Sequence, residues 1–103
     1  MLPAYVRIMG IDCSIEENAT ISSFEQPGVA DCPSHEILIS PNLSDEGKTS
    51  VLLHECLEMM NYFSQIGLKH RQITAVASGF YQLFADNPEL LDMFDEDVEL
   101  EEE

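Results

Sequence analysis

The spacing of apolar residues changes at Pro41, and this change constrains the fold more than any other feature of the sequence. Before Pro41, short apolar runs alternate with polar residues, which is typical of half-buried strands. After Pro41, apolar residues recur every three or four positions, which is typical of helices packed on a core. Because strands come first and helices follow, the sequence predicts an α+β fold. We expect a small N-terminal antiparallel sheet followed by two long helices.

The first half of the chain contains four candidate strands. They cover residues 4–9, 11–15, 20–24 and 35–40. Gly10 separates the first strand from the second, as a turn or a bulge. Loops are expected at residues 26–28, where Pro and Gly adjoin, and at residues 31–34.

The second half contains two long candidate helices. The first is expected over residues 45–66, with Ser44 or Asp45 as its N-cap and Gly67 just past its end. The second is expected over residues 70–85, and a short third helix over residues 89–94 follows Pro88. The apolar stripe of the first helix comprises Leu52, Cys56, Met59, Phe63 and Ile66, and that of the second helix comprises Ile73, Val76, Ala77, Phe80 and Phe84. We therefore predict one domain over residues 1–94 and a disordered acidic tail over residues 95–103.

Composition limits the function classes. No apolar run approaches the roughly 20 residues that span a bilayer, and the N-terminus does not resemble a secretion signal. The chain has three cysteines, an odd number at scattered positions, so we expect reduced thiols and a cytoplasmic location.

The net charge is −16, and residues 86–103 carry ten acidic residues and no basic one. This charge disfavours nucleic-acid binding and favours basic protein partners.

One segment carries chemistry, namely His54-Glu55-Cys56-Leu57-Glu58. On a helix, His54 and Glu58 lie one turn apart on the same face, and Glu55 lies beside them. A His-Glu-x-x-His zinc site uses the same spacing, with the adjacent Glu as general base, and a carboxylate can replace one imidazole as ligand. The alternative is a surface histidine with two solvated glutamates. The apolar residues around the segment favour the functional interpretation, because a buried ionisable group needs a partner.

Four stretches of the second half carry a resemblance, at residues 52–62, 68–73, 80–83 and 86–88. They resemble a family of small phage and prophage proteins described as zinc-metallopeptidase-like, in the subgroup with His-Glu-x-x-Glu. The resemblance covers residues 35–88 and implies a minimal zincin-like fold, zinc as cofactor and a peptide or protein substrate. It implies His54 and Glu58 as metal ligands and Glu55 as general base, in the cytoplasm of a bacterial host. It also makes His70 the candidate third ligand.

Helix geometry argues against His70. If the first helix persists to residue 66, Glu58 lies about 12 Å from its end, and His70 starts the next helix beyond that point. The residues expected beside His54 are then those at about 76–82, which offer no carboxylate. In that case His70 caps or pairs near a helix N-terminus instead.

Three functions follow from these alternatives. The first is a metal-dependent hydrolase, most naturally a peptidase. The second is a non-catalytic acidic protein-binding module on a degenerate zincin scaffold, and the third is a metal or polar cluster that only orders the two helices.

Other residues favour structural roles. We expect turn chemistry for Cys32-Pro33-Ser34-His35, a buried thiol at Cys56, and aromatic packing for Tyr62 and Tyr81.

Overall fold

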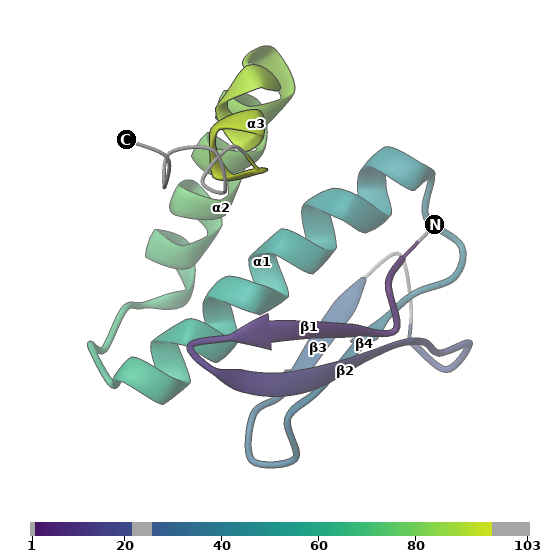
Figure 1. Ribbon diagram of the computed structural model, residues 1–103. Helices are drawn as coiled ribbons and strands as arrows, with labels where there is room; N and C mark the ends of the chain where they lie inside the picture. The colour runs from purple at the N-terminus through teal and green to yellow at the C-terminus, as the bar shows by residue number, and fades with distance from the viewer. Residues whose placement is uncertain (1, 22–25, 96–103) are drawn as a thin grey trace.

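A computed structural model describes residues 2–21 and 26–95 of the protein (Figure 1). One four-stranded sheet comes first and three helices follow, so the predicted α+β class is confirmed. The strands are β1 (Tyr5–Ile8), β2 (Ile11–Glu17), β3 (Gly28–Asp31) and β4 (Glu36–Ile39), and the helices are α1 (Asp45–Ser64), α2 (His70–Asp86) and α3 (Glu89–Asp95). Within these residues, no helix combines the length and the apolar character needed to cross a membrane.

The sheet is mixed, and the prediction of a purely antiparallel sheet was wrong. Its strand order is β1-β2-β4-β3, with β2 and β4 parallel and the other two pairs antiparallel. The central place of β4 fits its apolar side chains, because Ile37 and Ile39 are fully buried. In the centre of the sheet, β4 pairs with a strand on each side. β3, which starts at Gly28, lies at the edge of the sheet.

The β1–β2 connection is a tight hairpin turn. Met9 and Gly10 both have positive φ, at 51° and 85°. This combination is typical of the two-residue turns whose twist matches that of the flanking strands. Gly10 therefore marks a turn rather than a bulge.

The strand β3 was missed from the sequence, where Pro27 and Gly28 indicated a turn. Gly28 is instead a packing glycine. A Cβ atom there would lie 2.5 Å from Val51 Cγ1 and 3.0 Å from Glu55 Oε2 of α1. Its missing side chain lets the sheet edge approach the helix that carries the candidate site. The predicted strand at 20–24 lies largely outside the described residues, and Thr20 is in a turn held by Asn18 Oδ1.

The helix α1 covers one face of the sheet (Figure 1). Ser44 caps it as predicted, since its Oγ accepts the Gly47 backbone N–H at 3.0 Å. The core joins the sheet to this helix, and its buried members are Ile8, Cys13, Ile15, Ile37, Ile39 and Met59. Four residues of the predicted stripe, Leu52, Cys56, Met59 and Phe63, belong to this core or pack against it.

The end of α1 differs from the prediction. The helix stops at Ser64, and Gln65 takes a left-handed conformation with φ of 57°. Ile66 lies outside the helix and is 65% exposed, so its assignment to the apolar stripe was wrong. The early stop lets the chain fold back beside α1.

The helices α2 and α3 lie away from the sheet. α2 contacts α1 and α3, and α3 contacts α2 alone among the elements of residues 2–21 and 26–95. α1 and α2 are close where α2 begins and diverge toward the other end of α2 (Figure 1). Of the predicted α2 stripe, Ile73 and Ala77 are buried, whereas Val76 and Phe80 stay exposed. The predicted tail lies outside the described residues from position 96 onward, and Asp95 ends α3.

Candidate metal centre

His54 and Glu58 meet on one face of α1, as their spacing predicts. His54 Nε2 lies 3.2 Å from Glu58 Oε2, and the two side chains are 19% and 27% exposed. A regular helix places residues four apart one above the other, so no unusual backbone is needed for this pair. The Ser44 cap and the core contacts of Met59 fix the helix that carries the pair.

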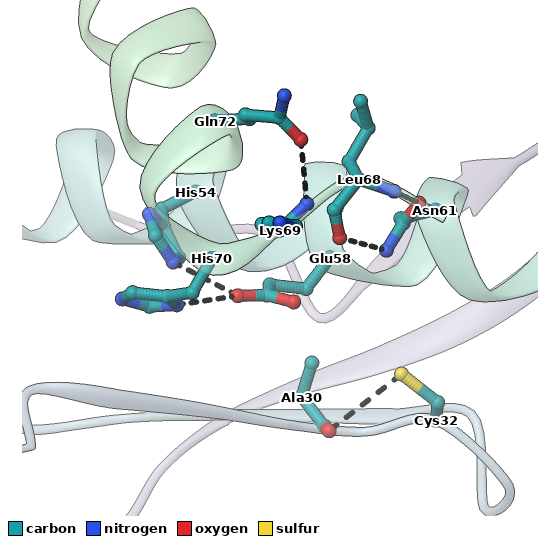
Figure 2. A network of polar contacts seen from close by, with 9 residues as sticks. All are labelled: Ala30, Cys32, His54, Glu58, Asn61, Leu68, Lys69, His70 and Gln72. Carbon is teal, nitrogen blue, oxygen red and sulfur yellow. Dashed lines mark hydrogen bonds and ion pairs between the residues drawn. The ribbon is translucent and has the colours of Figure 1, made fainter. Parts of the chain in front are cut away.

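His70 joins this pair from the first residue of α2. Its Nδ1 lies 3.1 Å from the same Glu58 Oε2, and the centroids of the His54 and His70 rings are 5.0 Å apart (Figure 2). The geometric argument against His70 was therefore wrong. It assumed a helix to residue 66, but α1 ends at Ser64 and the following five residues return the chain to Glu58.

Asn61 holds this return. Its Oδ1 accepts the Leu68 backbone N–H at 2.8 Å, and its Nδ2 donates to the Leu68 carbonyl at 3.1 Å (Figure 2). One side chain thus satisfies both polar groups of a loop residue two positions before His70. Asn61 follows Glu58 by three positions, so it lies on the same face of α1. That periodicity was visible in the sequence, but its loop partner was not.

The start of α2 is fixed by a second side chain. Gln72 Oε1 accepts the Lys69 backbone N–H at 2.8 Å (Figure 2). The Lys69 carbonyl accepts the backbone N–H groups of Gln72 and Ile73. Ile73 is buried one turn after His70. The position of His70 is therefore set by contacts on both sides of it.

The three side chains form a group that could hold a metal ion. Their ligand atoms all lie within 4.8 Å of one another. Ligands of a tetrahedral zinc ion, with bonds of about 2.0–2.2 Å, lie about 3.3 Å apart. Both contacts to Glu58 are close to this length, and His70, which is 77% exposed, has room to rotate toward His54. Two histidines and one glutamate are a donor set that catalytic zinc sites use, so the residues fit the predicted cofactor.

Glu55 lies next to the group and is buried, with 8% of its surface exposed. Burial, with a smaller contribution from the charge of Glu58, raises the pKa of Glu55 to about 7. The interpretation of Glu55 as a solvated surface glutamate was therefore wrong.

A pocket of about 750 Å³ opens beside these residues. Val51, His54, Glu55 and Glu58 of α1 line one wall. The residues of the sheet edge form a second wall, namely Gln26, Pro27, Gly28, Val29, Ala30 and Cys32. His70, Thr74, Ala77 and Ser78 of α2 form a third.

The strand beside the pocket is β3. β4 is central, whereas β3 is an edge strand and pairs only with β4 among the described residues. Of the stretch at 76–82 that was predicted to lie beside His54, Ala77 and Ser78 line the pocket, and Thr74 lines it as well because α2 starts beside Glu58. As expected from the sequence, this part of α2 contributes no carboxylate.

No protein-family model, no curated protein and no solved structure matches this chain. The resemblance to phage zinc-metallopeptidase-like proteins therefore stays a prediction from the motifs, and the site is interpreted from its own geometry.

The remaining sequence candidates have structural surroundings. Cys32 and His35 lie in a turn in which the His35 N–H donates to the Cys32 carbonyl, and the His35 ring packs edge-on against Phe63. Burial raises the pKa of the Cys56 thiol to about 11, which keeps it protonated at neutral pH. The Tyr62 ring packs against that of Phe63, and Tyr81 lies away from the pocket of His54.

Proposed function

We propose that the protein is a zinc-dependent hydrolase of the metallopeptidase type, with His54, Glu58 and His70 as metal ligands and Glu55 as general base. The observation that carries this proposal is the arrival of His70 at Glu58 from a different helix. Pairs of polar residues at i and i+4 are common on helices. A third ligand that lies 12 positions after Glu58 in the chain depends on the contacts of Asn61 with the loop.

The donor set leaves room for a substrate. His54, Glu58 and His70 would supply three protein ligands to a zinc ion, the number that catalytic rather than structural zinc sites use. When bound there, zinc would supply Lewis acidity toward a substrate carbonyl and make a water molecule more acidic. His54, Glu58 and His70 all line the pocket, so a substrate there would lie beside them.

Glu55 is placed to move a proton. It lies between His54 and Glu58 on the same helix, lines the same pocket and is buried, with 8% of its surface exposed. A carboxylate in this position can accept a proton from water and return it to the leaving amine. Gly28 of β3 lies close to its side chain, because a Cβ atom at Gly28 would come 3.1 Å from Glu55 Cγ.

The edge strand β3 supports a peptide as substrate. Its outer edge is not paired with another strand within residues 2–21 and 26–95. An extended peptide can add to such an edge through main-chain hydrogen bonds. A peptide held along Gly28–Asp31 would pass the pocket that contains Glu55 and the three ligands. The resemblance to phage proteins implies the same substrate class.

The test is turnover of a quenched-fluorescent peptide library by purified protein loaded with zinc. Ferrous iron and manganese are compared in parallel, because two histidines and a carboxylate also suit iron. We expect zinc-dependent cleavage that falls by about 10²- to 10⁴-fold in Glu55→Gln, while zinc affinity is retained. Glu46→Gln, an exposed residue of the same helix, is the matched control and should leave turnover unchanged. Equal turnover in Glu55→Gln and the unchanged protein would contradict the proposal.

One observation favours the second candidate, a non-catalytic binding module on the same scaffold. His70 is 77% exposed, and α2 presents Ala77 and Ser78 rather than a carboxylate to the pocket. A ligand side chain this exposed to water would lower the metal affinity of the site. Zinc binding without cleavage of any library peptide would select this candidate.

A further inference from the structure

A second concave surface lies between the helices, away from the metal centre. This α1–α2 groove has a volume of about 460 Å³. Its lining residues are Thr49, Leu52, Leu53, Cys56, Tyr81, Phe84, Ala85 and Leu91. None of them lines the pocket of His54 and Glu58. The groove exists because α2 diverges from α1 after Ala77, its last buried residue, as Figure 1 shows.

Large apolar side chains of the helices that form the groove stay exposed. On α2, Phe80 is 43% and Leu83 is 41% exposed, and on α3 Leu91, Met93 and Phe94 are 50%, 64% and 67% exposed. The lining of the groove is itself mostly apolar, with side chains of α1, α2 and α3. An exposed apolar surface of this kind marks an interaction site.

Acidic residues lie close in sequence to the residues that line the groove. Asp45 and Glu46 form the first turn of α1, next to Thr49, and Asp86, Glu89 and Asp92 lie at the end of α2 and on α3. The bases of α2 and its cap, Lys69 and Arg71, are at the opposite end of that helix. Lys48 Nζ lies 3.2 Å from Glu17 Oε2, so its charge is already paired.

The charge decides between possible occupants. A second copy of this chain would place the same acidic border against itself, in a protein of net charge −16, and like charges across an interface are costly. A basic partner gains from the same border. Two diverging helices also offer a slot whose walls fit the side-chain ridges of a third helix.

We propose that the α1–α2 groove binds an amphipathic helix of a partner protein, with apolar residues facing the groove and basic residues facing its acidic border. Anchors at i, i+3 or i+4 and i+7 of that helix would contact Leu53, Tyr81 and Leu91. This site is independent of the metal centre, so it holds whether or not the protein is a hydrolase.

The test uses a fluorescent peptide of Leu and Lys, about 18 residues or five turns long, with Leu at helical spacing. Binding is followed by fluorescence anisotropy with the full chain at about 0.15 M salt, where exposed charges are substantially screened. A peptide of the same composition with scrambled spacing and a peptide with Glu in place of Lys are measured beside it. We expect micromolar binding of the helical basic peptide and at least about tenfold weaker binding of the other two.

Two variants localise the binding. Leu91→Ser should weaken it by about tenfold or more, because Leu91 lines the groove, and its exposure makes the change compatible with folding. Ile66→Ser, equally apolar and exposed but in the loop before α2, should leave it unchanged. Equal binding to Leu91→Ser, or equal binding of the scrambled or acidic peptide, would overturn the proposal. So would a dimer in sedimentation equilibrium that Leu91→Ser dissociates, because a second copy would then occupy the groove.

Discussion

Replacement of Asn61 by alanine removes both side-chain hydrogen bonds that hold Leu68 against α1. A hydrogen bond of this kind contributes about 0.5–1.5 kcal/mol, so the two together contribute about 1–3 kcal/mol to the folded-back loop. If that loss falls on the position of His70, fewer molecules hold His70 beside Glu58. Zinc affinity then falls by up to about 5- to 150-fold.

A competition titration against a chromophoric chelator measures this effect. It is carried out on the unchanged protein, Asn61→Ala, His70→Ala and the double variant. Since Asn61 acts through His70, we expect Asn61→Ala to weaken zinc binding alone but to add little in the His70→Ala background. Gln82→Ala serves as the amide control, because Gln82 bonds Asp86 on α2, away from the pocket. Equal losses from Asn61→Ala in both backgrounds would refute the reasoning.

Three further predictions concern stability. Gly28→Ala should lower the free energy of unfolding by about 1–3 kcal/mol in urea, because the new Cβ would lie 2.5 Å from Val51 Cγ1, and an unchanged midpoint would contradict this packing. In metal-free protein the folded state holds the Glu55 proton more tightly than the unfolded state does, because the pKa of Glu55 is raised from 4.5 to about 7. The free energy of unfolding should therefore fall by up to about 3 kcal/mol as the pH rises from 4.5 through about 7. Glu55→Gln should abolish that loss in urea titrations at a series of pH values, and an identical pH profile in the variant would disprove it. Zinc at about 100 times its Kd should stabilise the fold by about 2.7 kcal/mol and raise Tm by roughly 10 °C or more, in a scan where a chelator and His70→Ala each cancel the shift. A Tm that ignores both zinc and chelator would count against the site.

Local patterns predicted the helices and the first half of the site. Periodicity and the Ser44 cap predicted α1, and the i, i+4 spacing alone brought His54 and Glu58 together. These features depend on residues within a turn or two of one another. The burial of Glu55 was also indicated, by the apolar residues around it.

Long-range contacts account for what the sequence did not predict. The end of α1 and the approach of His70 depend on Asn61 meeting Leu68, and a propensity pattern does not contain that contact. Gly28 indicated a turn, yet it begins the strand β3. A glycine is needed there because Val51 and Glu55 of α1 leave no room for a side chain. β4 lies in the centre of the sheet, beside β2, where Ile37 and Ile39 are fully buried. Its place in the strand order depends on a comparison of all the strands. The divergence of α2 likewise left Phe80 exposed, although its spacing predicted a buried stripe.

The most direct measurement is the zinc stoichiometry and affinity of the purified protein, compared with His54→Ala, His70→Ala and His35→Asn. His35 is the remaining histidine and lies in the turn before β4 against Phe63, and asparagine tolerates its left-handed backbone. We predict one tightly bound zinc ion per chain, retained in His35→Asn and lost in both of the other variants. Zinc that survives His54→Ala and His70→Ala, or no zinc above background in the unchanged protein, would contradict the account.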